Sequence, residues 1–398
     1  MKIDVPYLLI EINEDNIIFL VVKYNYELDF IVLEKKTIKS SGINKGKIID
    51  INILSNIIKE SLNEIEKKLS HTFKKATIIS DQNNISFINV SGYKKISGSQ
   101  FLEQDVSYIL NNLKKTIMDI ELKYSLIHLF NTSFVLDGEN LENMPIGLYG
   151  DFYNHHLTFV LAMKNDIKNL KLVLNKCHID IEKIILKPFA QNIFRLKKTH
   201  ANKIKCFIDI NKRSSSISIF QNLSFIYHQK FNFGTDIIVQ DICKLCSLKF
   251  NEVENILSKI NLNKNDNEKE FLSENYFTLS SFRKISLKHI EDIVFARVKE
   301  IFELIYEKNI NLAFLKSIDK EIQITSQEQA ILSHIKPLIK VMLQQNNKID
   351  FIDKIKEQPE VSCLSAAELI GKGWEREAIP IIQTKKSLIT RIFSNFFK

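Results

Sequence analysis

Two short acidic segments, about two hundred residues apart, are the strongest candidates for chemistry in this chain. The first reads Glu11-Ile12-Asn13 and the second Asp209-Ile210-Asn211, and each follows an apolar run and precedes a polar turn. A turn at the end of a strand binds phosphate when backbone N–H groups can approach the anion closely, which usually requires glycine with a positive φ. Neither segment contains glycine, so a phosphate site at either turn would have to bind the anion without the close backbone approach that glycine allows.

Other residues with catalytic or metal-binding chemistry are isolated. Cys243 and Cys246 form a CxxC without a second cysteine pair or a histidine set at zinc spacing, and their run is helical, so helix packing is favoured over a metal site. His155 and His156 lie in an alternating stretch that turns neighbouring side chains to opposite faces, which disfavours a shared metal ion. Since no acid/base pair stands out among the carboxylates, we expect a protein that is not an enzyme, and the CxxC receives no role.

The composition narrows the class of protein. The chain has 398 residues, which suggests two or more domains, and a net charge of +8 without a basic stripe interleaved with aromatic residues, so no nucleic-acid partner is expected. Glycine makes up 10 of the 398 residues, which disfavours any function that needs several glycine loops. Five cysteines without framework spacing fit a reducing compartment. No leader peptide and no bilayer-spanning run is read, so a cytosolic or peripheral membrane protein is expected.

The two acidic segments open similar sets of predicted strands. Residues 8–13, 17–22 and 28–33 are expected to form one meander, and residues 206–211, 216–220 and 224–229, with a turn at Gln221-Asn222, a second. Both begin with an apolar–acid–Ile–Asn pattern. The repetition predicts a pseudo-duplicated fold, with chance similarity of two hairpins as the alternative.

Helices are expected after each meander. Residues 53–69, with Asn52 as the cap, and residues 236–245, 252–260 and 287–306 keep helical spacing, and a polar loop is expected at 261–270. Between residues 81 and 161 the pattern differs: it predicts a strand at 85–90, a helix at 102–118 and a hairpin that turns at Asp137-Gly138. This order predicts a small inserted α+β subdomain.

The last twelve residues form an amphipathic pattern. At helical spacing, one half of the surface is apolar and the other half is polar or cationic. The apolar half and the flanking or interspersed cations are Leu388, Ile389, Ile392, Phe393, Phe396 and Phe397, with Lys385, Lys386, Arg391 and Lys398. An apolar face with flanking cations is typical of an interfacial membrane anchor. The alternative is a terminal helix that packs on the protein's own core.

Several stretches, taken together, resemble the FtsA family of bacterial cell division proteins, which are actin-like. The stretch SGINKGKIID at 41–50 resembles that family's G-I-x-K-G-x-I-x-D segment, residues 134–148 resemble its Y-x-(L/I)-D stretch with N-P-x-G-x-x-G downstream, and VSCLSAAELI at 361–370 resembles its late Y-S-T-A-x-G-L helix. The two acidic segments stand where actin-like ATPases carry their phosphate clamps. The order of the stretches agrees over essentially the whole chain.

The resemblance implies an α/β, two-domain fold of the actin/Hsp70 ATPase type with an inserted α+β subdomain and a C-terminal amphipathic helix. Residues 1–82 and 162–200 would form domain I, to which 363–374 would return, and residues 83–161 the insert that resembles subdomain 1C. Residues 201–362 would form domain II, 375–386 a linker and 387–398 the membrane-targeting helix.

The nucleotide segments depart from the family's pattern. The matching positions are Glu11, Asn13, Asp209, Asn211, Ser214 and Thr325, and the family's glycines are absent from all three segments. Asparagine can adopt the left-handed conformation, so we expect the turns themselves to persist. Glu14 and Asp15 would place negative charge beside any phosphate. We therefore expect no ATP hydrolysis and no cofactor, with binding of ATP and magnesium as the alternative.

The resemblance also implies a function. It implies a protein that tethers the FtsZ ring to the cytoplasmic face of the cell membrane at the division site, as a peripheral protein, and that helps recruit later division proteins. The implied partners are an anionic lipid surface, further copies in actin-like polymers, and the FtsZ C-terminal tail, which would meet Arg283, Lys284, Arg297 and Glu300 near residues 281–306. A PilM-like adaptor of pilus assembly and a working actin-like or Hsp70-like ATPase are the alternatives.

Overall fold

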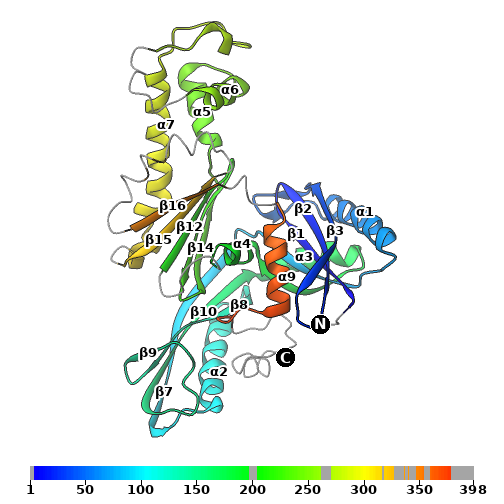
Figure 1. Cartoon of the computed structure of the whole chain (residues 1–398), viewed down its shortest axis with the longest axis vertical. Coiled ribbons are helices and arrows are strands. Elements are labelled where there is room, and N and C mark those ends of the chain that lie inside the picture. The colour runs from blue at the N-terminus through cyan, green and yellow to red at the C-terminus, as the bar shows by residue number, and fades with distance from the viewer. Residues whose placement is uncertain are drawn as a thin grey trace. The chain divides into compact units, whose positions relative to one another are not determined.

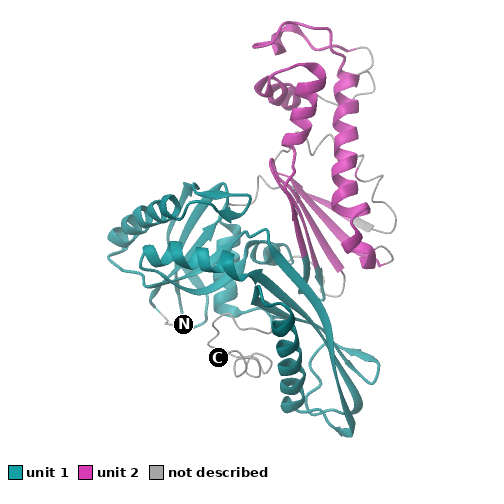
Figure 2. Ribbon diagram, turned by 180° about the vertical axis from the view of Figure 1, so that it is seen from behind, with its two compact units in different colours: residues 1–202, 220–227, 359–398 teal, residues 203–219, 228–358 magenta. Residues whose placement is uncertain are grey.

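A computed structural model describes residues 4–196, 204–260, 270–315, 318–326, 336, 339, 347–353 and 359–377. The chain divides into two compact units (Figure 2). Unit 1 comprises residues 1–202, 220–227 and 359–398, and unit 2 comprises residues 203–219 and 228–358. Each unit combines sheets with helices, so the expected α/β class is confirmed.

The first five-stranded sheet has the order β11-β6-β1-β2-β3, and Figure 1 labels β1, β2 and β3 of this sheet. Its strands are β1 (Pro6–Ile12), β2 (Asn16–Tyr24), β3 (Phe30–Lys39), β6 (Lys75–Ser80) and β11 (Asp180–Leu186). The predicted β1-β2-β3 meander is present and antiparallel, while β6 runs parallel to both β1 and β11. The third strand begins later than predicted, because Leu28, with a φ of 66°, belongs to the preceding turn.

Successive side chains of β1 point to opposite faces of the sheet, and a different layer of helices covers each face. Leu8, Ile10 and Ile12 share a core with α1 (Ile51–Leu69) and α3 (Lys164–Lys176). Glu11 therefore points to the other face, where α9 (Val361–Lys372) packs on β1 and β2 and on α4 (Lys187–Leu196).

The cap of α1 differs from the prediction. Asp50, not Asn52, is the N-cap, and its Oδ1 accepts a hydrogen bond of 2.9 Å from the N–H of Ile53. Asn52 lies inside the first turn because the helix begins at Ile51, and its side-chain oxygen accepts instead from Lys176 at 2.5 Å.

The insert within unit 1 is a four-stranded sheet with one covering helix. Its strands β7 (Ile85–Gln100), β8 (Tyr124–Leu136), β9 (Glu139–Leu141) and β10 (Tyr149–Met163) have the order β7-β10-β8-β9, and α2 (Glu103–Ile120) shares a core with them. The predicted hairpin at Asp137-Gly138 is confirmed, and both turn residues have a positive φ. As alternation predicted, His155 is buried, which lowers its pKa to about 3, whereas His156 is partly exposed.

A second five-stranded sheet repeats the topology of the first. Its strands are β12 (Ile204–Ile210), β13 (Ser215–Gln221), β14 (Ser224–Phe231), β15 (Lys320–Ser326) and β16 (Asn347–Asp353). The order β14-β13-β12-β15-β16 places a meander of three consecutive strands beside two parallel strands, as in unit 1, which accounts for the repeated sequence pattern. The β13–β14 turn is at Asn222-Leu223, one residue later than predicted, and both residues have a positive φ.

The helices of unit 2 are close to their predicted positions. They are α5 (Asp236–Cys246), α6 (Phe250–Lys259) and α7 (Leu287–Phe302), and α7 continues into a π-helical turn at Glu303–Glu307. Cys243 and Cys246 lie on α5, and burial raises the pKa of both thiols, which disfavours the reactive thiolate.

The segment after α9 is bound to the β13–β14 turn and to the insert, and we call Trp374, Glu375, Arg376 and Glu377 the tail root. The indole N–H of Trp374 donates to the Leu223 carbonyl at 2.7 Å, and the Arg376 carbonyl accepts from the N–H of Asn131 on β8 at 2.8 Å. The first residues of the expected 375–386 linker are therefore held in place. The rest of that linker and the predicted helix 387–398 lie outside the described residues.

A buried pair completes the attachment of the tail root. The N–H of Leu186 donates to Nε2 of His128 at 3.2 Å, so Nδ1 carries the proton that His128 donates to Glu377 at 2.5 Å. Both side chains are buried.

No helix among the described residues is long and apolar enough to cross a bilayer.

Candidate functional site

Glu11 lies at the centre of the first predicted loop and is fully buried. Its carboxylate accepts from Nζ of Lys187, the first residue of α4, at 2.8 Å and from Nδ2 of Asn13 at 2.8 Å. At the start of α9, the Ser362 hydroxyl also donates to Glu11, and the Cys363 thiol lies 3.7 Å from the same oxygen. All of these donors belong to unit 1.

The charge of Glu11 is balanced from within the protein. Burial would lower the pKa of Lys187, but the nearby Glu11 and Asp81 carboxylates outweigh that effect and raise it well above its usual range. Burial and the Glu11 carboxylate also raise the pKa of the Cys363 thiol. The site is thus an internal ion pair between a carboxylate and an ammonium, with its hydrogen bonds made to the protein itself.

Asn13 closes the first turn with its side chain. Its Oδ1 accepts from the N–H groups of Asp15 at 3.0 Å and Asn16 at 2.8 Å, a turn in which the side chain stands in for backbone. We expected asparagine to preserve the turns by adopting the left-handed conformation. That expectation was wrong, because neither Asn13 nor Asn211 has a positive φ.

The second loop uses the N-terminal amides of α5. The Asn211 and Lys212 carbonyls accept from the N–H groups of Thr235 at 3.0 Å and Asp236 at 2.9 Å. Free amides at a helix N-terminus are what would otherwise hold an anion. Gly234 allows the close approach, since a Cβ there would lie 2.1 Å from the Asn211 oxygen.

The remaining predicted positions of this loop also bind one another within unit 2. The Thr325 hydroxyl donates to Asp209 across the paired strands β12 and β15, and the N–H of Asn211 donates to the Ser214 carbonyl at 2.9 Å. Lys212, which follows Asn211 in this turn, pairs with Glu254 at 3.1 Å.

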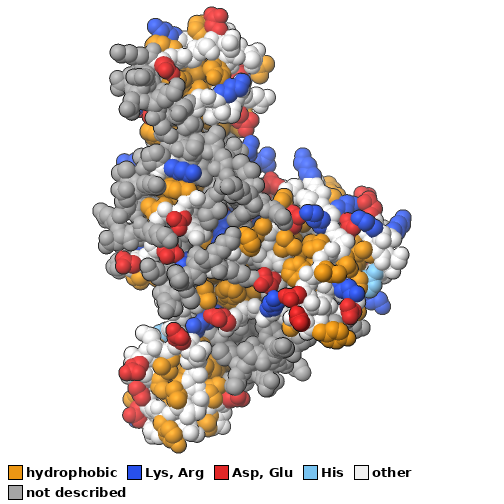
Figure 3. All heavy atoms as spheres, in the orientation of Figure 1, with side chains coloured by type: hydrophobic (Ala, Val, Ile, Leu, Met, Phe, Trp, Pro, Cys, Tyr) orange, Lys and Arg blue, Asp and Glu red, His pale blue; other side chains and the backbone are white. Residues whose placement is uncertain are grey.

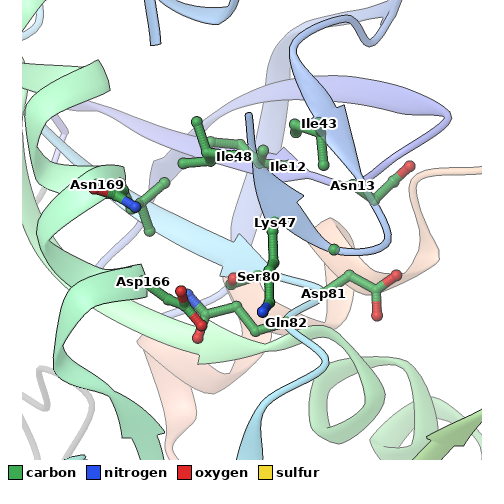
Figure 4. A pocket seen from close by; sticks show the side chains of 12 residues that line it. Ile12, Asn13, Ile43, Lys47, Ile48, Ser80, Asp81, Gln82, Asp166 and Asn169 are labelled. Carbon is green, nitrogen blue, oxygen red and sulfur yellow. The ribbon is translucent and has the colours of Figure 1, made fainter. Parts of the chain in front are cut away.

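A small hollow lies at the carboxyl ends of β1 and β6 (Figure 4). It is also lined by the start of α3 and by the hairpin of β4 (Ile43–Asn44) and β5 (Lys47–Ile48), whose Lys47 reaches toward Gln82. The hollow has a volume of about 30 Å³, enough for one or two water molecules and far too little for a nucleotide. Sequence reasoning had not singled out Ser80, Gln82, Asp166 or Asn169, which carry no recognisable spacing.

The chain is similar in sequence to several bacterial cell division proteins. The chain is 21% identical to the cell division protein FtsA of Agrobacterium fabrum over 294 residues, which are 72% of this chain and 66% of the relative. It is 22% identical to FtsA of Bacillus subtilis over 275 residues, 68% of this chain and 62% of the relative. FtsA of Buchnera aphidicola, from Acyrthosiphon pisum, is 22% identical over 250 residues, 63% of this chain and 59% of the relative.

The chain is similar to FtsA, at low identity. No profile of a known protein family matches it, and the match spans slightly less than two thirds of these relatives' lengths. A solved structure of the PilM–PilN type IV pilus biogenesis complex superposes with a TM-score of 0.55 at 10% identity, covering 93% of this chain and 96% of the other. This likeness shows that the FtsA-like chain has the two-domain actin-like fold.

The residues predicted to bind a partner are not gathered on one helical face of the FtsA-like chain. Arg297 on α7 donates to Asp241 on α5 and to Glu300 at 2.6 Å, so its charge is already paired. Arg283 and Lys284 are exposed in a non-helical segment, because α7 begins only at Leu287, after its N-cap Ser286. The predicted helix 287–306 begins where α7 begins, so Arg283 and Lys284 lie before it.

Glu252 fixes the loop that precedes this segment, and no sequence motif pointed to it. It accepts from the N–H groups of Leu279 at 2.7 Å and Ser280 at 2.9 Å, from the Ser280 hydroxyl at 2.5 Å and from the N–H of Lys249 at 2.8 Å. Burial alone would raise the pKa of Glu252, but these hydrogen bonds lower it to about 2. The loop therefore presents exposed Leu279 and Phe282 from a fixed backbone.

We expect Lys187→Met to lower the free energy of unfolding by roughly 3–5 kcal/mol, because it leaves the Glu11 carboxylate buried and unpaired. Adding Glu11→Gln should recover part of the loss. Urea unfolding followed by circular dichroism measures both effects. The matched control is Lys372→Met, since Lys372 pairs with Asp29 at 2.5 Å where both side chains are about half exposed, and its loss of stability should be much the smaller of the two. Equal losses for Lys187→Met and Lys372→Met would contradict the internal ion pair.

Proposed function

We propose that the chain is a non-enzymatic cell division protein that tethers FtsZ to the cytoplasmic face of the cell membrane at the division site and helps recruit later division proteins. The observation that carries this proposal is the similarity to FtsA over 72% of the chain. The likeness to PilM concerns the fold alone, so the sequence relatives favour division over the alternative role in pilus assembly. An actin-like fold also suits self-association into polymers.

An adaptor without ATPase activity fits the two loops. Each loop satisfies its polar groups internally: Glu11 is paired with Lys187, and the first amides of α5 are bonded to Asn211 and Lys212. A triphosphate with magnesium would have to break several of these bonds without gaining glycine backbone contacts in return.

We accordingly expect neither turnover of ATP nor micromolar binding. Calorimetric titration with ATP and magnesium should give no heat beyond dilution, and phosphate release should equal the rate without protein. A micromolar dissociation constant would contradict this expectation and would show that the loops can open.

The FtsZ C-terminal tail is the proposed partner of the segment before α7 in unit 2. Arg283 and Lys284 are exposed cations, and Lys284 lies 4.4 Å from the ring centre of the half-exposed Phe271. Exposed apolar side chains flanked by cations suit a short peptide that combines apolar and acidic residues. Arg297 and Glu300 would contribute only if the tail displaced their mutual ion pair.

We expect Arg283→Glu combined with Lys284→Glu to weaken binding of an FtsZ tail peptide by roughly tenfold, because two attractions become repulsions. Fluorescence titration measures the affinity. Lys308→Glu is the matched control, since Lys308 is an exposed cation of the same unit that pairs with Glu303 at 2.6 Å. Arg297→Glu should weaken binding too. Because this change also breaks the bond to Asp241, the melting temperature of the variant must be compared with that of the parent protein. Unchanged affinity for the double variant would remove Arg283 and Lys284 from the site.

Membrane attachment is proposed for residues 387–398. A helix of twelve residues is about 18 Å long, too short for the roughly 30 Å hydrocarbon core, so it would lie in the interface with Leu388, Ile389, Ile392, Phe393, Phe396 and Phe397 toward the lipid. Lys385, Lys386, Arg391 and Lys398 would meet anionic headgroups.

We expect Phe393→Asp with Phe396→Asp to abolish flotation with anionic vesicles while leaving the circular dichroism spectrum unchanged. The loss follows because two carboxylates would have to enter the apolar layer. Ser394→Ala with Asn395→Ala, on the polar half, is the matched control and should float like the parent. Unfolding of the Phe variant would instead show that this helix belongs to the core, and normal flotation would show that the anchor lies elsewhere.

A further inference from the structure

The turn between α2 and β8 carries two apolar side chains that the fold leaves uncovered. Ile120 is 71% exposed and Leu122 is 69% exposed, whereas Val106, Ile109, Leu110 and Ile117 of α2 lie in the core of the insert. We propose that this turn, residues 120–123, is a second lipid contact beside the terminal helix. The inference rests on the proposed membrane attachment.

The turn has a fixed backbone. The N–H of Glu121 closes α2 on the Ile117 carbonyl at 2.8 Å, and the N–H of Tyr124 donates to the Glu121 carbonyl at 3.0 Å. From the start of α3, Lys164 donates twice, with Nζ to the Leu122 carbonyl at 2.7 Å and with its N–H to the Lys123 carbonyl at 2.9 Å. Ile120 and Leu122 are therefore held outward, and inserting them into lipid orders little additional backbone.

The charge around the turn favours an anionic surface. The neighbourhood holds four lysines, Lys114, Lys115, Lys123 and Lys164, against two carboxylates, Asp119 and Glu121. Exposed aliphatic side chains with adjacent lysines combine the two attractions that bind proteins to anionic bilayers. On the face shown in Figure 3, by contrast, the apolar side chains in the lowest part of the view lie among acidic ones.

The direction of the tail root points toward the same turn. Glu377 bridges Phe130 of β8 in the antiparallel sense, so at Glu377 the tail root runs toward Tyr124, the first residue of β8 and the residue after the turn. From Phe130 to Tyr124 is roughly 20 Å at the rise of a strand. Residues 378–386 can span at most about 30 Å, so the predicted membrane helix starts within reach of the turn.

Two attachments would determine how the protein lies on the membrane. A helix at the end of a linker leaves the body free to rotate, whereas a second contact from the insert fixes one side of unit 1 against the bilayer. The two contacts should also strengthen vesicle binding together, because once one contact has formed, the other forms within the same bound complex.

The test uses the full chain and vesicles of phosphatidylcholine and phosphatidylglycerol in equal amounts. Ile120→Asp with Leu122→Asp should weaken vesicle binding roughly tenfold. The matched control is Tyr26→Asp with Leu172→Asp, at positions of unit 1 that are 79% and 50% exposed, and it should bind like the parent. Deletion from Ser387 onward should abolish binding.

The outcomes separate the two proposals. Parent-like binding by the turn variant, with loss on deletion, overturns the turn as a lipid contact and leaves the anchor standing. Parent-like binding by the deletion variant overturns the proposed membrane helix itself. If the turn variant keeps vesicle binding but changes the oligomeric state in sedimentation without lipid, the turn is a contact between copies of the chain and the lipid proposal fails.

A second measurement covers a turn variant that does not fold. The fluorescence of the tryptophan introduced by Leu122→Trp in the full chain should be quenched by brominated lipids, which reach only residues within the bilayer. The fluorescence of the tryptophan introduced by Leu172→Trp should not be quenched. A Leu122→Trp emission that brominated vesicles leave unchanged overturns the proposal.

Discussion

The buried contact between Glu11 and Lys187 organises the centre of unit 1. It joins the end of β1 to the start of α4, and Ser362 and Cys363 bring the start of α9 to the same carboxylate. An unpaired carboxylate in this position would be strongly destabilising, so these elements must stay together for the layer to form. The same contact pairs the acid at the position where the sequence comparison places an actin-like phosphate loop, so the stability of unit 1 depends on a residue of that loop.

The two halves of the duplicated fold replace glycine in different ways. In the first turn, the Asn13 side chain accepts the backbone N–H groups that need a partner. In the second, the loop's own carbonyls take the first amides of α5, and Gly234 supplies the space. Both solutions hold the strand–turn–strand geometry through hydrogen bonds within the protein.

The local sequence pattern predicted most helices and strands but not which distant residues they contact. Alternation and turn residues were enough for both meanders and for the hairpin at Asp137-Gly138, and helical spacing placed α1, α5 and α6 closely. The cap of α1 was misplaced because Asp50 and Asn52 are equally good capping residues and only the backbone decides between them. Lys187 and Glu252 act through residues distant in the sequence, and no spacing rule marks such long-range contacts.

The tail root gives the molecule a defined mechanical path. A load applied beyond Glu377 first meets the bridge to Phe130, the Arg376–Asn131 hydrogen bond and the buried His128–Glu377 pair, and only then reaches Trp374 and α9. Because the bridge is antiparallel, a pull toward the start of β8 would load these bonds together in shear rather than one after another. Tension on the tail would therefore be borne by the insert, and the helix that completes the Glu11 site would be shielded from it.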